Sequence, residues 1–132
     1  GIGTWVRMIL VDTAVWIDHF RKNNPQLKAL LMQGLVATHP LVIGELACGN
    51  LKQRNDILSW LSPLPVADLA DQDEILYFFE KRHLMGLGIG IVDIHLLASA
   101  IISKFPIWTL DKRLKTAAQN LNAHYDTSPT KN

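Results

Sequence analysis

Short apolar runs alternate with longer helical patterns along the chain, and this alternation constrains the fold more than any other feature. Residues 8–11 are apolar, residues 107–110 are apolar except for Thr109, and both runs contain β-branched members. Each run is followed by a segment whose apolar residues recur every three or four positions, as in a helix. Buried strands separated by helices indicate a parallel sheet covered on both faces. The sequence therefore predicts an α/β fold, a three-layer α/β/α sandwich with a central, mainly parallel sheet.

Proline, glycine and helix-capping residues set the expected element boundaries. Pro25 and Pro40 suit the first turns of helices, and Gly34 suits a position just past a helix end. Asp71 with Glu74 three residues later forms a capping-box pattern. The expected strands cover 8–11, 35–38, a weak segment near 66, 107–110 and an edge segment at 124–126. The expected helices cover 13–21, 25–32, 40–49, 53–61, 71–83, 91–103 and 112–121.

Length and composition favour one compact domain. Of the 132 residues, 48% are apolar and 19% are charged, and the formal net charge is +1. We assign residues 8–132 to a single domain and residues 1–7 to a leader or to vector-derived sequence. The small net charge means that any polyanion site must be local. A single cysteine and the lack of an apolar stretch of ~18 residues lead us to expect a cytoplasmic protein without membrane contact.

Four acidic residues stand in apolar surroundings. Asp12 and Asp111 each follow a predicted strand, while Glu45 and Asp93 lie on apolar faces of predicted helices. Ligands of parallel α/β sheets bind beyond the carboxyl ends of the strands. Unpaired buried carboxylates are costly, so we expect the four acids to share a divalent cation, which takes oxygen ligands. The alternative is that the acids are unrelated, with Asp12 and Asp111 serving only as helix caps.

Four segments together resemble a known family. The segments MILVDTAVWID, VIGELACG, GIVDIHLLASA and IWTLDKRL resemble the PIN-domain ribonucleases, and most closely the VapC-type toxins of toxin–antitoxin pairs. The resemblance extends from Met8 to about Asn122. It implies an acidic pocket that binds Mg²⁺ or Mn²⁺ and activates water, with Thr13 and Thr109 as supporting polar residues. The catalytic, metal-binding acids that it implies are Asp12, Glu45, Asp93 and Asp111.

The resemblance also implies an activity and partners. The activity is metal-dependent endoribonucleolytic hydrolysis of RNA phosphodiester bonds, and the partners are a second copy of the chain and a cognate antitoxin. A metal held by carboxylates suits this chemistry because it activates water and neutralises phosphate charge. Many relatives carry a further acid just after the last motif, where this chain has Lys112 and Arg113. This departure bears on whether a second metal ion binds.

Basic residues near the acidic segments are candidate contacts to RNA phosphates. We expect some of four residues to serve in this way, although a solvated surface position is the alternative for each: Arg82, Lys112, Arg113 and Lys115. The glycine-rich stretch GLGIGIVD lacks the last glycine of a dinucleotide-binding loop, so it is interpreted as a connection between helices. His95 is expected to pack rather than to bind the metal, because it points away from Asp93 on the helix. Cys48 is expected to fill the core.

Two other classes of protein compete with the nuclease. A catalytically silent PIN-like binding module would keep the pocket only to receive an antitoxin or another basic segment. An aspartyl-phosphate receiver or phosphatase would also place an aspartate after a strand, but phosphatases of this kind need a D-x-D pattern and Ala14 replaces the second acid. Incorporation of acid-stable phosphate at Asp12 would favour this last class.

Overall fold

The computed structural model describes residues 7–127, so most of the expected leader, residues 1–6, and the last five residues lie outside the described part. Within this part the chain forms three strands and seven helices. In chain order they are β1 (Ile9–Val11), α1 (Thr13–Lys22), α2 (Pro25–Met32), β2 (Val36–Ala37), α3 (Pro40–Cys48), α4 (Arg54–Leu61), α5 (Gln72–Lys81), α6 (Ile91–Ser103), β3 (Ile107–Trp108) and α7 (Lys112–Asn120). None of the helices in residues 7–127 has the length and apolar character needed to cross a membrane.

The sheet is parallel and has β1 at its centre. Its order is β2-β1-β3, with Leu10 opposite Ala37 on one side and opposite Ile107 on the other. Two isolated parallel bridges extend it, Thr38 with Val66 and Ile107 with His124. The expected strands near 66 and 124–126 are therefore single bridges rather than regular strands. All carboxyl ends of β1, β2 and β3 point to one edge of the sheet.

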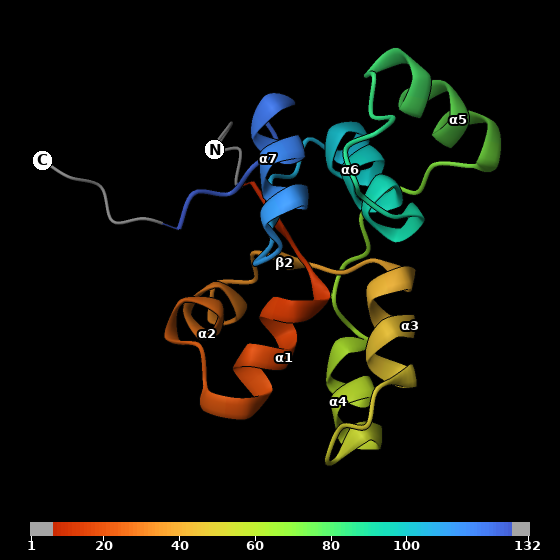
Figure 1. The fold of residues 1–132 in the computed structure, drawn as a ribbon. Helices are drawn as coiled ribbons and strands as arrows, with labels where there is room; N and C mark the ends of the chain where they lie inside the picture. The colour runs from red at the N-terminus through yellow and green to blue at the C-terminus, as the bar shows by residue number, and fades with distance from the viewer. Residues whose placement is uncertain (1–6, 128–132) are drawn as a thin grey trace, which may run out of the picture.

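Helices cover both faces of this sheet, which confirms the predicted three-layer arrangement (Figure 1). Helices α1 to α4 lie on one side, and α5 to α7 lie on the other. The core is built around the central strand, where Leu10 and Val11 are fully buried, and it includes Val36, Ile107 and Leu114. Strands buried on both faces are expected to be almost continuously apolar, as these are.

Local sequence explains where most helices begin. Asp12, Asn24 and Asp111 cap α1, α2 and α7 with their side-chain oxygens, and Asp71 with Glu74 forms the predicted capping box of α5. Pro25 and Pro40 occupy the first turns of α2 and α3, where the missing N–H costs nothing. Gly34 has a φ of 72°, a backbone conformation that favours glycine, and it ends the α2 segment. The predicted helix boundaries differ from the observed ones by at most about two residues.

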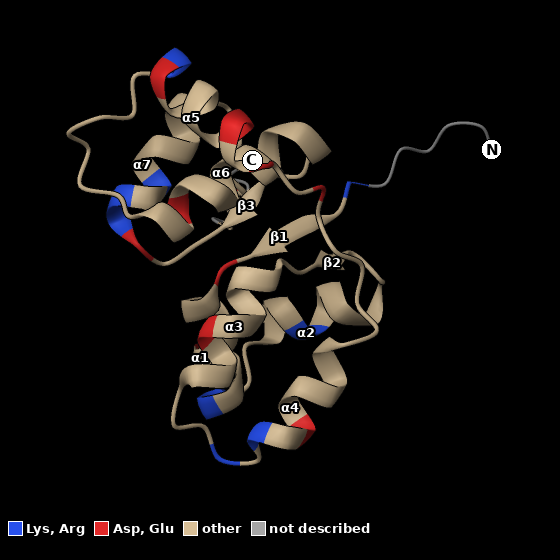
Figure 2. Cartoon of the chain, turned by 90° about the vertical axis from the view of Figure 1, so that its right-hand side faces the viewer, with Lys and Arg blue, Asp and Glu red and all other residues tan. Residues whose placement is uncertain are grey.

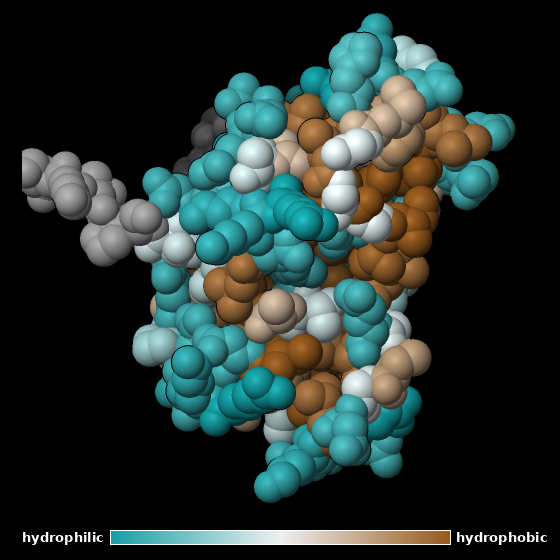
Figure 3. Space-filling view, viewed as in Figure 1, coloured by the Kyte–Doolittle hydropathy of each residue, from teal (hydrophilic) through white to brown (hydrophobic). Residues whose placement is uncertain are grey.

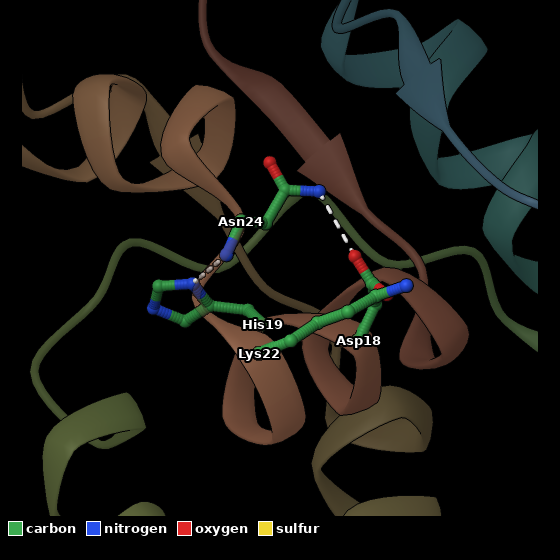
Figure 4. A network of polar contacts seen from close by, with 4 residues as sticks. All are labelled: Asp18, His19, Lys22 and Asn24. Carbon is green, nitrogen blue, oxygen red and sulfur yellow. Dashed lines mark hydrogen bonds and ion pairs between the residues drawn. The ribbon is translucent and has the colours of Figure 1, made fainter.

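The turn between α1 and α2 is held by polar contacts (Figure 4). The Asn24 backbone N–H donates to Nδ1 of His19 at 3.1 Å, and its side-chain amide donates to Asp18 at 3.2 Å. Lys22 pairs with Asp18 at 3.4 Å across one helical turn. These contacts give Asp18 and His19 structural roles at the far end of α1 from Asp12.

Candidate active site

Asp12 is the buried centre of the candidate site. It follows β1 directly, and only 7% of its surface is exposed. One carboxylate oxygen accepts the backbone N–H of Thr13 at 2.8 Å, and the other accepts the hydroxyl of Thr109 at 2.7 Å. Burial raises the pKa of Asp12 against the lowering effect of these two bonds, and repulsion from Glu45 and Asp111 adds to the rise. Asp12 is thus a buried acid that accepts hydrogen bonds but forms no ion pair within residues 7–127.

Glu45 reaches the same region from α3. The hydroxyl of Thr13 donates to its Oε1 atom at 2.5 Å, so Thr13 links the start of α1 to α3. Thr13 itself is the first residue of α1, and the cap of that helix is Asp12. Thr13 therefore contacts the Glu45 carboxylate and does not cap α1.

Asp93 lies in the first turn of α6, three residues after the capping residue Gly90. Burial, and to a smaller extent repulsion from Asp12, Asp111 and Glu45, raises the pKa of Asp93 to about 6. The backbone N–H of Gly90 acts in the opposite direction, as a donor to the Asp93 carboxylate. An acid at this position after the cap is well placed to reach back to the cap N–H.

Asp111 approaches from the end of β3. Its Oδ1 atom accepts the backbone N–H groups of Arg113 at 2.9 Å and of Leu114 at 3.0 Å, so it caps α7. The hydroxyl oxygen of Thr109 accepts the backbone N–H of Asp111 at 3.0 Å, while the same hydroxyl donates to Asp12. Thr109, which is buried, therefore connects the two acids that follow strands.

The four acids belong to one electrostatic site that the chain does not neutralise. Asp12 and Asp93 each feel repulsion from Glu45 and Asp111, and no ion pair joins any of the four to Lys, Arg or His in residues 7–127. Figure 2 shows acidic segments after β1, on α3 and before α7 on the same side of the molecule, with Lys and Arg at the start of α7 beside them. Like charges brought together without a counter-charge are unfavourable unless a cation binds.

The side chains of the four acids do not converge closely enough to form a complete metal site. Among residues 7–127, no three His, Cys, Asp or Glu side chains form a group already able to hold a metal ion. Their donor chemistry nevertheless fits Mg²⁺ or Mn²⁺, since these ions prefer carboxylate oxygens and often use only one or two of them together with substrate phosphates. Glu45 is exposed, and only its Oε1 atom accepts the Thr13 hydroxyl.

Two expectations about burial were wrong. Glu45 and Asp111 are exposed, so the argument from the cost of a buried carboxylate applies to Asp12 and partly to Asp93. Cys48 is exposed as well, and does not fill the core. Asp111 caps α7, and Glu45 and Cys48 are exposed positions of α3, an exposure that their apolar sequence neighbours do not reveal.

The four candidate phosphate contacts lie in two places. Lys112 and Arg113 begin α7 next to Asp111 and line a hollow of about 240 Å³. Lys115 follows one turn later and acts electrostatically on His124. Arg82 caps the other end of a different helix, α5, and lines a separate hollow between α5 and α6.

Sequence reasoning missed the roles of two groups. One is the backbone N–H of Gly90, which the spacing of Gly90 and Asp93 would have revealed as a cap with its third residue. The other is His39, which caps α3 by accepting the Leu41 N–H at 3.0 Å on Nδ1 and packs edge-on against His95. Its pKa is lowered to about 4 by burial and by repulsion from His95, so the ring is neutral. The packing role expected of His95 agrees with this contact.

Comparison with known proteins identifies the family. The PIN domain family matches residues 9–120. The chain is 46% identical over 111 residues to Ribonuclease VapC32 of Mycobacterium tuberculosis, strains CDC 1551 / Oshkosh and H37Rv, which covers 83% of this chain and 90% of the relative. The chain therefore belongs to the PIN domain family, and the resemblance to VapC-type proteins is confirmed.

Solved structures show the same fold. PAE2754 from Pyrobaculum aerophilum superimposes with a TM-score of 0.59 at 17% identity, over 91% of this chain and 90% of that one. FitAB bound to an IR36 DNA fragment gives a TM-score of 0.57 at 21% identity, over 85% and 91% of the two chains. FitAcB from Neisseria gonorrhoeae gives a TM-score of 0.56 at 18% identity, over 85% and 94%.

Proposed function

We propose that the protein is a metal-dependent endoribonuclease that hydrolyses RNA phosphodiester bonds and acts as the toxin of a toxin–antitoxin pair. The observation that carries the proposal is the buried Asp12, which interacts with other acids of the site while none of the four acids forms an ion pair with Lys, Arg or His in residues 7–127. The likeness to Ribonuclease VapC32 over most of both chains supports RNA as the substrate. This substrate and its antitoxin would place the protein in the cytoplasm.

The acids would hold Mg²⁺ or Mn²⁺ at the carboxyl edge of the sheet. When bound, such an ion activates water for attack on phosphorus and offsets the charge of the phosphate. Asp12, Asp93, Glu45 and Asp111 would supply its protein ligands. Thr109 orients Asp12, and Thr13 orients Glu45, through the hydroxyl bonds described above. The ligands therefore come from four different elements, and each hydroxyl fixes one of them.

RNA would approach over the start of α7. Lys112 and Arg113 lie beside Asp111, where phosphates flanking the scissile bond would pass, and Lys115 extends this basic strip by one turn. Neutralisation of phosphates by such side chains is the main source of affinity for nucleic acid and weakens with salt. Arg82 lines a different hollow, so its contribution to RNA binding would be separate from that of the α7 residues.

An antitoxin would find an apolar groove formed by α1, α2 and α4. It is lined by Trp16, Phe20, Leu31, Trp60 and Leu64, and Trp60 is 59% exposed. Lys52 lines the adjoining hollow, which shares His19, Phe20 and Trp60 with this groove. Apolar walls beside the positive charge of Lys52 suit an amphipathic helix with acidic residues. We propose this groove as the antitoxin site.

A second copy would bind the face made by α5 and α6, which Figure 3 shows as a broad hydrophobic area on the right of the molecule. A hollow of about 550 Å³ is lined there by Tyr77, Phe78, Ile101 and Ile102. Asp73 lies at the start of α5, and Lys81 lies at its end. A two-fold axis across α5 would bring each acid near the partner's base, so the face is complementary to itself.

Replacing Asp12 by asparagine tests the nuclease proposal. Asparagine caps a helix about as well as aspartate, so the fold should survive, whereas Mn²⁺-dependent cleavage of a structured RNA should fall more than about a hundredfold. Asp71→Asn is the matched control, because Asp71 also caps a helix but lies on α5 away from the four acids. Cleavage is followed by gel with and without a chelator, and folding by circular dichroism.

The same experiment separates the nuclease from the silent binding module. The absence of a preformed ligand group in residues 7–127 is the observation that favours the silent module. Full cleavage by Asp12→Asn contradicts the proposed site. Tight binding of an antitoxin by wild-type protein that cleaves no RNA with either metal supports the silent module instead.

A further inference from the structure

Arg113 contacts the glycine-rich loop that precedes α6. Its Nη1 atom donates to the carbonyl oxygen of Gly88 at 3.3 Å. The guanidinium also lies directly over Gly88, because a Cβ atom at this position would stand 2.7 Å from Nη1 and 3.2 Å from Cζ. A hydrogen bond and a close approach of the same guanidinium thus join the first turn of α7 to this loop.

The loop is held on its other side by the core. Leu84, at its beginning, is buried, and Ile89 packs against the buried residues Ile75, Ile94 and Ala98. Gly88, which contacts Arg113, has a φ of 73° and directly precedes Ile89, which contacts the core. The loop therefore has a defined path into Gly90, although it contains three glycines.

The position of Gly90 affects Asp93, one of the four acids, because Gly90 caps the helix that carries it. It caps α6, and Asp93 is the third residue of that helix, the register in which a carboxylate reaches the N–H of the cap. On the other side, Arg113 is only two residues from Asp111, whose carboxylate accepts the Arg113 backbone N–H. Asp111 is thus linked by contacts to Arg113 and Gly88, and the chain leads from Gly88 to Gly90, whose N–H acts on the Asp93 carboxylate.

We propose that Arg113 is a positioning residue, whose guanidinium fixes the Gly88–Gly90 loop so that the Gly90 N–H orients the Asp93 carboxylate relative to Asp111. This inference rests on the proposed role of the two acids as metal ligands. It assigns one N–H of the guanidinium to the loop and leaves the others for phosphate. Partners that orient metal ligands from outside commonly affect metal affinity by about tenfold or more.

The loop provides a matched pair of variants. Gly88→Ala and Gly86→Ala both place alanine at a positive φ, 73° and 76°, so both carry similar backbone strain. Only the Cβ at position 88 meets Arg113, whereas a Cβ at position 86 has nothing within 4 Å. Arg113→Gln removes the guanidinium of the same contact. Arg21→Gln, at an exposed position of α1, controls for the loss of one positive charge.

The test measures Mn²⁺ binding without RNA, from the electron paramagnetic resonance signal of free Mn²⁺, and hydrogen exchange at the Gly90 amide. We expect Gly88→Ala and Arg113→Gln to weaken Mn²⁺ binding about tenfold and to speed exchange at Gly90. Gly86→Ala and Arg21→Gln should do neither. Arg113→Lys should restore part of the affinity, because lysine can still donate to the Gly88 carbonyl.

The contrary outcomes are distinct. Equal effects of Gly88→Ala and Gly86→Ala on Mn²⁺ binding, or wild-type binding and exchange in Arg113→Gln, overturn the positioning role while the nuclease proposal stands. Wild-type protein that binds no Mn²⁺ overturns the proposed function and this inference with it. Loss of RNA affinity in Arg113→Gln with unchanged Mn²⁺ binding assigns Arg113 to phosphate alone and likewise overturns it.

Discussion

At the scale of single residues, Asp12 and Asp93 show two ways of treating a carboxylate. Asp12 is nearly inaccessible, but two hydrogen-bond donors serve it. Asp93 has only the backbone N–H of Gly90 to lower its pKa, and burial with repulsion from its neighbours raises that pKa to about 6. The fold without metal therefore tolerates the Asp93 charge at a cost, as expected of a group selected for binding rather than for stability.

We predict that Asp93→Asn stabilises the metal-free protein at neutral pH. The folded-state pKa of Asp93 lies above its ordinary value of 3.8, so the folded protein binds the extra proton as the pH falls through 6. This group thus favours folding toward acid and opposes it at pH 7.5. Allowing for the part of the carboxyl that faces water, the neutral amide should add about 1 kcal/mol and about 3 °C.

Thermal melts with chelator at pH 7.5 and pH 4 check this prediction. The gain should shrink as the pH falls, because wild-type Asp93 becomes protonated too. Asp111→Asn, an exposed cap replaced by another good cap, should change the melting temperature little at either pH. A lower melting temperature of Asp93→Asn at pH 7.5 would show that the charge is compensated in the metal-free fold.

At the scale of elements, the sequence predicts the helices well because their ends are marked locally. Pro25–Met32 and Ile91–Ser103 begin and end where proline, glycine and apolar periodicity place them. The short outer strands were harder, since Val66 and His124 each contribute one bridge that depends on partners far along the chain. The same reason limits prediction of the site: the Thr13–Glu45 and Thr109–Asp12 bonds span 32 and 97 residues.

The α5–α6 face provides a prediction at this scale. Tyr77, which is 67% exposed at the centre of α5, should lie in the dimer interface, so Tyr77→Arg should yield a monomer in sedimentation velocity. Met32→Arg, at an exposed apolar residue of α2, should leave the dimer intact. Asp73→Lys and Lys81→Glu should each weaken self-association through like charges, while a mixture of the two should form a heterodimer.

The charge mixture is the decisive part of that experiment. In each mutant copy, positions 73 and 81 carry charges of the same sign, so at these two positions only unlike copies are complementary. A wild-type monomer, or a dimer indifferent to Tyr77→Arg, would place any self-association on another face. Recovery in the mixture cannot follow from misfolding, because neither partner is altered by mixing.

At the scale of the whole molecule, the candidate site joins both helical layers. Glu45 belongs to α3 on one side of the sheet, whereas Asp93 and Asp111 belong to α6 and α7 on the other. An ion held between them would therefore cross-link the two layers. Ligands that bind only the folded chain stabilise it in proportion to the logarithm of their concentration.

We predict that Mn²⁺ raises the melting temperature of the wild-type protein and that this gain falls below about pH 6, where Asp93 takes up a proton and competes with the ion. At a hundred times the dissociation constant the gain should be about 2.7 kcal/mol. Differential scanning fluorimetry with Mn²⁺ or chelator between pH 5 and pH 8 measures it. Asp12→Asn should lose most of the gain, and a pH-independent gain would exclude Asp93 as a ligand.

Asp12 and Asp111 each cap a helix and also belong to the candidate site, and these two roles affect how genetic screens are interpreted. Alanine at either position removes a cap worth about 1 kcal/mol and lowers the amount of folded protein as well as any activity. If colonies survive toxin expression by acquiring alanine at either position, their survival would not distinguish a lower amount of folded protein from a loss of catalytic activity. Survivors that carry asparagine, at normal cellular levels, would isolate the chemical role.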